Sequence, residues 1–454
     1  MIFLGEAYNI TVHFSLAFVG TFENPEPLEN PEQPVIFSDI IPTDSKQYSS
    51  SLFLKGVTHM QNPMTFLIIF LGVMTAMAPL STDMYLPSLP EISSSFGIST
   101  SMTQLTLTMT MIGMSVGQIL GGPVSDRLGR KIPLFVGMVG FTAASLVCAV
   151  TENIYVFLAF RFVQGLSGAF GIVIARAVAR DVVDGPALMK FMAILMMVNG
   201  LAPIAAPVAG AQVLRFTSWH GVFEVLVVIG VLQLIATAFF KETLKKNERV
   251  RSFSEGFVAF AGLIKNRYFF GHCLLQCFFF GAFFSYIAGS VFLFQNIYGV
   301  SPQVYSYIFG GIGLGLMCMG MIPAKMAGIV REIDFLKFSL WVPMIGSLFL
   351  LGGIWLGAPM AYTLPVLFIT IVPLSIMGAA SVSLALSRCG KNAGSGSALI
   401  GFFNMILGGV MMPVTGIAGS HTAMPMGIIM VVCYMLSLVV FYGMIVPSHK
   451  NSEE

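Results

Sequence analysis

The chain has 454 residues, of which 56% are hydrophobic and only 10% are charged. An ordinary soluble domain carries roughly 25% charged residues, so this chain has too few charges to cover a water-soluble surface. Its formal net charge of +2 provides no basic face for phosphate groups, which argues against nucleic-acid binding. The composition therefore predicts a membrane protein that crosses the bilayer many times, with membrane lipid around it.

The first 59 residues differ from the rest of the chain. They contain seven acidic and two basic residues, whereas residues 60–454 contain fourteen acidic and twenty-one basic ones. This segment has neither a basic start nor an apolar run long enough to span a bilayer, so it is neither a signal peptide nor a membrane helix. It is either a disordered extension or sequence upstream of the true start at Met60. We favour the second interpretation, because residues 55–57 can be encoded by a ribosome-binding sequence two codons before Met60.

From Met64 onward, apolar runs of about 20 residues, the length that crosses ~30 Å of hydrocarbon, alternate with short polar breaks. The pattern predicts an all-α polytopic membrane protein with twelve transmembrane helices. A long polar segment at 241–267 divides the spans into two six-helix bundles, 60–240 and 268–446, followed by a tail at 447–454. The expected spans are 65–88, 104–123, 132–150, 154–176, 189–213, 221–240, 268–296, 304–324, 336–356, 362–386, 396–419 and 425–446.

The placement of Lys and Arg predicts the orientation, because cytoplasmic loops carry an excess of both. Nearly all basic residues after Met60 fall on one side of the predicted topology. The exceptions are Arg215, on the opposite side, and Arg161, inside a span. Both ends of the chain are therefore expected in the cytoplasm.

The loop between the second and third spans, residues 122–131, reads GPVSDRLGRK. One interpretation is a positive loop that only sets the topology. However, the pattern G-x-x-S-D-R-x-G-R-K resembles the loop signature of the major facilitator superfamily, and the resemblance extends over residues 64–446. In that family the loop is a cytoplasmic latch, which implies a gating role for Gly122, Asp126, Arg127, Gly129, Arg130 and Lys131.

Two charged residues are predicted inside spans. Arg161 lies in span four, where a charge at mid-bilayer costs at least ~2.5 kcal/mol, and Asp83 lies late in span one. Span one runs outward and span four inward, so at ~1.5 Å per residue their depths agree within a few Å. We expect an ion pair between Asp83 and Arg161 in a low-dielectric cavity. The alternatives are an Arg161 that extends to the outer interface and an Asp83 that caps a helix end there.

The surroundings of both residues carry a further resemblance. Asp83-Met-Tyr85-Leu-Pro-x-Leu-Pro is similar to the Bcr/CflA group of drug:proton antiporters within the superfamily, and Arg161-x-x-Gln164-Gly165 resembles a signature of proton-coupled members. The resemblance implies that Asp83 and Arg161 couple transport to protons.

Span five is expected to bend. It contains Pro203, Pro207 and Gly210, and proline loosens the helical hydrogen-bond ladder, so we predict a hinge there. Antiporters of the superfamily carry a Gly-Pro-rich signature in this span. Here each proline follows alanine, so the direction of transport rests on resemblance to the subgroup.

The family fold implies a central cavity lined mainly by spans one, four, seven and ten. Span seven is rich in aromatic residues, which would form an adaptable apolar pocket. The substrate-binding side chains that we predict are Tyr85, Gln164, Asn199, Gln276, Phe280 and Phe284.

The sequence thus predicts a secondary active transporter in a bacterial cytoplasmic membrane, exporting small amphiphilic drugs, such as bicyclomycin- or chloramphenicol-like compounds, in exchange for protons. The alternative is an exporter or proton symporter of a small endogenous metabolite. An enzyme is disfavoured because the spans lack HExxH and nucleophile–base pairs, and a channel because of the latch loop. We expect no cofactor and no metal, with the proton as coupling ion, and the resemblance implies a monomer.

Overall fold

The computed structural model describes residues 63–245, 249, 262–326, 329–387, 389 and 393–450, and within these residues it contains helices, turns and loops but no strand. The all-α fold predicted from the sequence is confirmed. The N-terminal extension 1–59, most of the connector between the halves and the last four residues lie outside the described residues, so the predicted domain boundaries stay predictions. Residues Asn62–Glu454 form one unit by their contacts.

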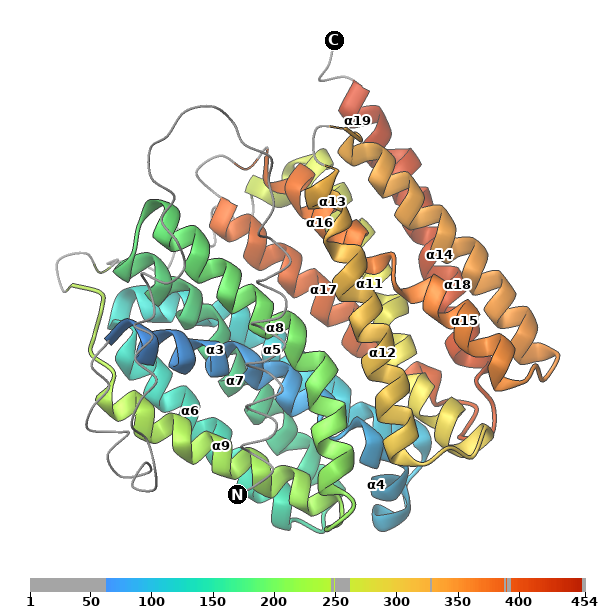
Figure 1. Cartoon of the computed structure of the whole chain (residues 1–454), viewed down its shortest axis with the longest axis horizontal. Helices are drawn as coiled ribbons and strands as arrows, with labels where there is room; N and C mark the ends of the chain where they lie inside the picture. Colours follow the sequence, from blue (N-terminus) through green and yellow to red (C-terminus); the bar gives the residue numbers. More distant parts are fainter. Residues whose placement is uncertain are drawn as a thin grey trace, which may run out of the picture. The chain divides into compact units, whose positions relative to one another are not determined.

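The helices fall into two groups that follow each other in the chain (Figure 1). The first group consists of α3 (Pro63–Asp83), η3 (Leu86–Ser88), α4 (Leu89–Phe96), α5 (Thr100–Leu128), α6 (Lys131–Val150), α7 (Ile154–Val182), α8 (Gly185–Val213) and α9 (Trp219–Phe239). The second group consists of α11 (Arg267–Phe292), η5 (Leu293–Ile297), α12 (Pro302–Gly320), α13 (Ile322–Lys325), α14 (Glu332–Trp355), α15 (Met360–Ile371), α16 (Leu374–Leu386), α17 (Ala393–Thr415), α18 (Met424–Val440), η7 (Phe441–Ile445) and α19 (Val446–Lys450).

Short polar side chains set the start of several helices. The side chain of Ser99 accepts the backbone N–H of Met102 at the start of α5, and Asn153 and Asn266 cap α7 and α11 in the same way. Such caps satisfy amide groups that have no partner within the helix. The polar breaks between apolar runs therefore end one helix and begin the next.

Eleven helical segments among the described residues are long and apolar enough to cross a membrane, against the twelve predicted. The predicted span 304–324 corresponds to α12, which has 19 residues and is not among the eleven. Five glycines and two tyrosines in α12 lower its mean hydropathy. The span at 362–386 is split into α15 and α16 at Pro373, which has no N–H to continue the ladder. The count of twelve and the location of both termini stay predictions.

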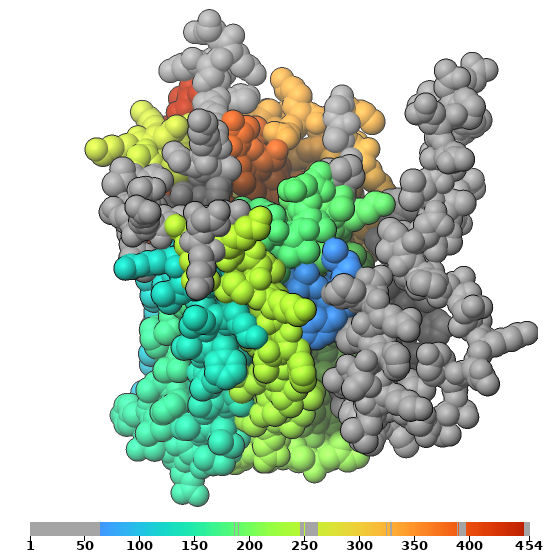
Figure 2. All heavy atoms as spheres, turned by 90° about the vertical axis from the view of Figure 1, so that its left-hand side faces the viewer, coloured from blue at the N-terminus to red at the C-terminus, as the bar shows by residue number. Residues whose placement is uncertain are grey.

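One outer face of the first group is apolar. Helices α6 and α9 pack against each other and lie side by side in Figure 2. Large apolar side chains on both helices are exposed, among them Val136, Val150, Leu232 and Phe239. A continuous apolar surface is unfavourable in water but matches lipid chains. Together with the eleven candidate spans, this surface identifies a multi-pass integral membrane protein.

Helices α5 and α7 approach each other closely through glycines. A Cβ atom on Gly165 would meet the backbone oxygen of Thr110, and a Cβ on Gly113 would meet that of Phe162. Backbone at this distance cannot be displaced by a rotamer change, so both glycines are required for the contact. The contact positions Arg161, one turn before Gly165, inside the first group.

We predict that Gly165→Val destabilises the protein by ~1–3 kcal/mol, because the added side chain forces α5 and α7 apart. The midpoint of thermal unfolding of the purified protein, measured at one scan rate, checks this. Gly378→Ala in α16 is the matched control, since a Cβ there meets no atom within 4 Å. Equal midpoints for the two variants would contradict the prediction.

Candidate functional site

An apolar cavity of about 420 Å³ lies between the two groups of helices. Its lining comes from α3, α5, α7 and α8 of the first group and from α11, α12 and α17 of the second. Span ten was predicted to line the cavity. Among the described residues this prediction is wrong, because α15 and α16, which form that span, supply no lining residue. Besides the hydroxyl of Tyr286, the polar side chains in the lining are few: Thr82, Asp83, Gln118, Arg176, Asn199, Ser397 and Asn404.

One end of the cavity is closed by hydrogen bonds between the groups. Gln104 donates to the carbonyl of Ala288 at 3.1 Å, and Thr108 donates to the carbonyl of Gly409 at 2.5 Å. Ser101, Gln295 and Gln303 make similar bonds to backbone carbonyls of the opposite group. From this closed end the cavity extends past Asp83 toward Gln118 and Arg176. Those two residues lie on the side of the molecule that carries the loop 122–131.

Asp83 is the last residue of α3 and the only carboxylate in the described lining of the cavity. Its side chain accepts a hydrogen bond from the hydroxyl of Thr82 at 2.9 Å, and only 7% of the residue is exposed. A buried carboxylate with a single neutral partner holds its charge at a cost in free energy. Asp83 is therefore a buried carboxylate that a ligand in the cavity would meet.

Arg161 is fully buried, so it does not extend to the interface. Its Nη1 donates to the carbonyl of Ser81 at 2.9 Å and to the side chain of Gln164. The Cζ atom lies 4.2 Å from the ring centroid of Tyr85 and 5.5 Å from that of Phe223. Neutral oxygens and ring faces thus hold the guanidinium, the rings through cation–π attraction.

The predicted direct ion pair between Asp83 and Arg161 is absent: among the described residues, Arg161 contacts no carboxylate. The prediction was wrong because depth alone does not decide which way a side chain points. The guanidinium of Arg161 points at the backbone of α3 two residues before Asp83, whereas Asp83 faces the cavity. Both groups are therefore attached to the last turn of α3, Asp83 by its own backbone and Arg161 by its hydrogen bond to Ser81.

The predicted cavity residues divide into two sets. Asn199, Phe280 and Phe284 line the cavity as expected. The other three do not line it: Tyr85 and Gln164 belong to the cluster around Arg161, and Gln276 lies behind Asn404, from which it accepts a hydrogen bond at 3.2 Å.

Sequence reasoning missed five polar residues of the cavity wall, namely Thr82, Gln118, Arg176, Ser397 and Asn404. Arg176 was counted among the loop bases, and Asn404 lies in an apolar span with no neighbouring charge to mark it. A single amide in span eleven was the available signal for Asn404.

The predicted hinge residues all lie inside α8, which runs unbroken through Pro203 and Pro207. Pro203 lines the cavity. A Cβ atom on Gly210 would collide with the backbone oxygen of Met84, so this glycine allows close packing of α8 against the segment that follows Asp83. Bending at these residues stays a prediction.

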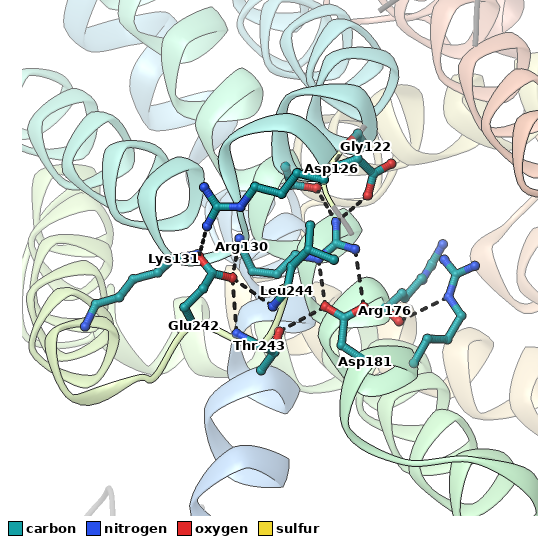
Figure 3. Close-up of polar contacts among 12 residues, drawn as sticks. Gly122, Asp126, Arg130, Lys131, Arg176, Asp181, Glu242, Thr243 and Leu244 are labelled. Carbon is teal, nitrogen blue, oxygen red and sulfur yellow. Dashed lines mark hydrogen bonds and ion pairs between the residues drawn. The ribbon is translucent and has the colours of Figure 1, made fainter. Parts of the chain in front are cut away.

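Arg130 is the centre of the loop 122–131 (Figure 3). Its guanidinium donates to Asp126 at 2.5 Å, to Ser125 at 2.9 Å and to Asp181 at the end of α7 at 2.8 Å. Burial by itself would lower the pKa of Arg130, but the hydrogen bonds to Asp181 and Asp126 outweigh it and raise the pKa above its usual value. The charge of Arg130 therefore joins the ends of α5 and α7 at every physiological pH.

The other residues that were predicted to form the latch lie at several places around the loop 122–131. Gly129 has φ +94 and turns the chain between α5 and α6, a conformation that glycine adopts readily. Gly122 lies inside α5 and makes no turn. Lys131 donates its Nζ to the carbonyl of Ala238 at 2.8 Å. Arg127 lies in the last turn of α5.

The start of the connector between the halves is bound to this loop (Figure 3). Glu242 accepts the backbone N–H of Arg130 at 2.8 Å and that of Lys131 at 3.2 Å. Thr243 donates to Asp181 at 2.9 Å. A carboxylate on the first amides of α6 complements the positive end of the helix dipole. The sequence did not reveal this contact, because Glu242 reads as a solvated residue of a polar segment.

Comparison with known proteins agrees with the helical membrane fold described above. Residues 71–413 match the family model of the Major Facilitator Superfamily. The Bacillus subtilis (strain 168) protein named Uncharacterized MFS-type transporter YdgK is 37% identical over 382 residues, which cover 83% of this chain and 95% of the relative. The Bicyclomycin resistance protein homolog of Haemophilus influenzae is 29% identical, with 84% of this chain and 97% of that protein covered.

More distant matches agree in fold. Multidrug resistance protein MdtL of Klebsiella pneumoniae (strain 342) is 26% identical, with 83% of this chain and 95% of that protein covered. The crystal structure of a D-xylose-proton symporter superposes with a TM-score of 0.65 at 14% identity, over 83% of this chain and 97% of the symporter. At that identity the structural match concerns the fold alone.

We predict that Glu242→Ala releases the connector and speeds tryptic cleavage after Lys245 several-fold, because Glu242 ties the start of the connector to the first amides of α6. Limited proteolysis followed by mass spectrometry measures the rate. Glu152→Ala, an exposed residue in the loop between α6 and α7, should leave the rate unchanged. Equal rates in both variants would rule out the anchoring role.

Proposed function

Because the chain belongs to the Major Facilitator Superfamily, it is a membrane transporter and not an enzyme, and we propose that it exports small amphiphilic drugs in exchange for protons. The proposed location is the cytoplasmic membrane of a bacterium, with both termini inside and the protein acting as a monomer. Relatives named for bicyclomycin and multidrug resistance support this choice of substrate class. The proposed coupling to protons has a separate basis, the geometry around Asp83.

The observation that carries the proposal is a single buried carboxylate in the described lining of a largely apolar cavity between two helix bundles. Asp83 is the group in the described lining best suited to exchange a proton, since Arg176 keeps its charge over the physiological range. Binding of a cationic or amphiphilic drug beside Asp83 would favour its charged form, whereas an empty, dry cavity would favour the neutral form. Drug and proton would therefore compete for one site, as exchange requires.

Arg161 would couple this competition to conformation. Its guanidinium holds the carbonyl of Ser81, so the last turn of α3 cannot move without disturbing a buried charge. When the bundles tilt to open the hydrogen-bonded end of the cavity, Asp83 would move with that turn into contact with the other compartment. Protonation there and release of the proton inside would complete the cycle.

Aromatic rings support an amphiphilic substrate. Phe280, Phe283 and Phe284 lie within 6.1 Å of one another by ring centroids and line the cavity together with Tyr286. Such rings supply a large apolar contact area and attract cations over their faces.

We predict that Asp83→Asn abolishes drug transport driven by a pH gradient in inverted membrane vesicles, because the amide cannot carry the exchanged proton. Drug uptake and the accompanying proton flux are measured together. Asp184→Asn, at an exposed site, is the control and should transport normally. Undiminished exchange in the Asp83 variant would refute proton coupling at this residue.

The competing function, transport of an endogenous metabolite, gives a different result in whole cells. An efflux-deficient host that expresses the protein would then show unchanged susceptibility across a drug panel. A drug exporter lowers susceptibility to at least one amphiphilic compound, and that compound becomes the probe for the vesicle assay.

We predict that Phe280→Ala weakens drug binding roughly tenfold, since loss of about 1.5 kcal/mol of apolar contact corresponds to that factor. The apparent KM for the drug identified in the panel measures the change. Phe349→Ala serves as the control, because Phe349 is exposed on α14, away from the cavity. An unchanged KM in the Phe280 variant would show that the drug binds elsewhere.

A further inference from the structure

An apolar groove lies on the outside of the second group of helices, where α12 lies between α8 and α15 (Figure 1). Its volume is about 400 Å³, and it is lined by Tyr307, Gly311 and Ile312 of α12 and by Leu364 and Phe368 of α15. Tyr307 and Phe368 are exposed, so the groove opens on the outer surface of the bundle. In a membrane protein, lipid chains surround such a surface.

Gly311 forms the floor of this α12–α15 groove. A Cβ atom on Gly311 would meet no atom within 4 Å, whereas other glycines of α12 pack closely. A Cβ on Gly313 would press on Ile204 of α8, and one on Gly315 would press on Phe368. Those contacts fix α12 between its neighbours, and above Gly311 they leave a hollow that no side chain fills. An acyl chain is the apolar group that a bilayer supplies to fill it.

A polar cluster with one positive charge lies at the edge of the groove that faces α8. Gln212, in the last turn of α8, donates its Nε2 to the hydroxyl of Tyr307 at 3.4 Å. Arg215, in the turn that follows α8, donates its Nη1 to Gln212 Oε1 at 3.1 Å. Because Tyr307 itself lines the groove, this hydrogen-bonded series joins the apolar groove to a guanidinium.

The charge of Arg215 is not neutralised by a carboxylate. Arg215 forms no ion pair among the described residues, and the carboxylate of Glu91 on α4 accepts the N–H of Trp219 instead. A guanidinium has five N–H donors, so Arg215 has donors left for the paired oxygens of a phosphate. Arg215 is also the one base of the Lys/Arg pattern that falls on the opposite side of the predicted topology, and drug export gives it no role.

We propose that Arg215, Gln212 and the α12–α15 groove bind an anionic phospholipid, with the phosphate at Arg215 and one acyl chain over Gly311. The groove follows α12 from Val304 to Ile312, a rise of ~12 Å. That length is close to the ~15 Å of hydrocarbon in one leaflet. The inference requires only that the chain spans a membrane, so it does not depend on drug export.

The bound acyl chain would lie directly behind the wall of the central cavity. Ile312 is the residue that the described linings of the groove and the cavity share, and it is 2% exposed. One side chain therefore separates the two spaces. A lipid in the groove would pack against Ile312 from outside and oppose its displacement from the cavity wall.

Native mass spectrometry of the full chain in detergent, titrated with phosphatidylglycerol or with diacylglycerol of the same chains, tests the phosphate contact. We expect phosphatidylglycerol to bind about tenfold more tightly, because only its phosphate forms charge-assisted hydrogen bonds. Arg215→Gln should remove this preference. Lys265→Gln is the matched control, since Lys265 is an exposed base before α11, and it should keep the preference.

A second pair of variants tests the acyl-chain contact. Gly311→Leu fills the groove, so it should weaken the binding of both lipids several-fold. Gly352→Leu on α14 is the control, because a Cβ there likewise meets no atom within 4 Å, and it should bind both lipids as the wild type does. If Gly311→Leu fails to fold, the wild-type chain decides: phosphatidylglycerol with four-carbon chains, which cannot fill the groove, should bind more weakly than the long-chain lipid.

Three results would overturn the proposal. A preference for phosphatidylglycerol that persists in Arg215→Gln, or that Lys265→Gln removes equally, places the phosphate elsewhere. Long-chain lipid that binds Gly311→Leu normally, or wild-type protein that binds the short-chain lipid equally well, places the acyl chain elsewhere. A dimer that Gly311→Leu dissociates would give the groove to a second copy of the chain. None of these measurements uses drug transport, so their failure leaves the proposed function intact.

Discussion

The architecture depends on how a positive charge is kept inside the membrane without a carboxylate. Arg161 is fully buried, and it is held by the carbonyl of Ser81, by Gln164 and by the rings of Tyr85 and Phe223. An ion pair would have consumed the charge of Asp83. Because neutral groups hold the arginine instead, the carboxylate of Asp83 is left to face the cavity.

The two ends of the cavity are held by different kinds of bond. At the closed end, neutral side chains such as Gln104 and Thr108 donate to backbone carbonyls of the opposite half. Such bonds contribute about 0.5–1.5 kcal/mol each and form or break without moving charge. At the other end, the charges around Arg130 stay within the first half and tie it to the start of the connector at Glu242. Opening of the hydrogen-bonded end would therefore separate none of the ion pairs found among the described residues.

Hydrophobic run length and the Lys/Arg pattern were enough to predict an all-α membrane fold, because a bilayer admits few other structures. They could not predict the break at Pro373 or the short α12, because the position of single prolines and glycines determines where a helix breaks and how apolar it is. Burial of Asp83 and Arg161 also followed from the sequence. Their separation did not, because it depends on the direction of each side chain after the helices have packed.

Three of the residues that the sequence missed have one property in common. Asn404, Asp181 and Glu242 each obtain their role from a partner more than forty residues away, and nothing in their own neighbourhood marks them. The signature loop and the charged spans could be recognised in the sequence because each depends on residues that are close together in the chain. Long-range polar pairing becomes visible only when the helices are assembled.

The two halves supply different side chains to the cavity wall. The charged residues of the described lining, Asp83 and Arg176, belong to the first half, whereas its phenylalanines belong to the second. Asn404 of the second half is hydrogen-bonded to Gln276 behind the wall. Since the two bundles approach the same space from opposite sides, a ligand that contacts both would lie between a charged and an aromatic wall, although no hydrogen bond joins Asp83 to Asn404 among the described residues.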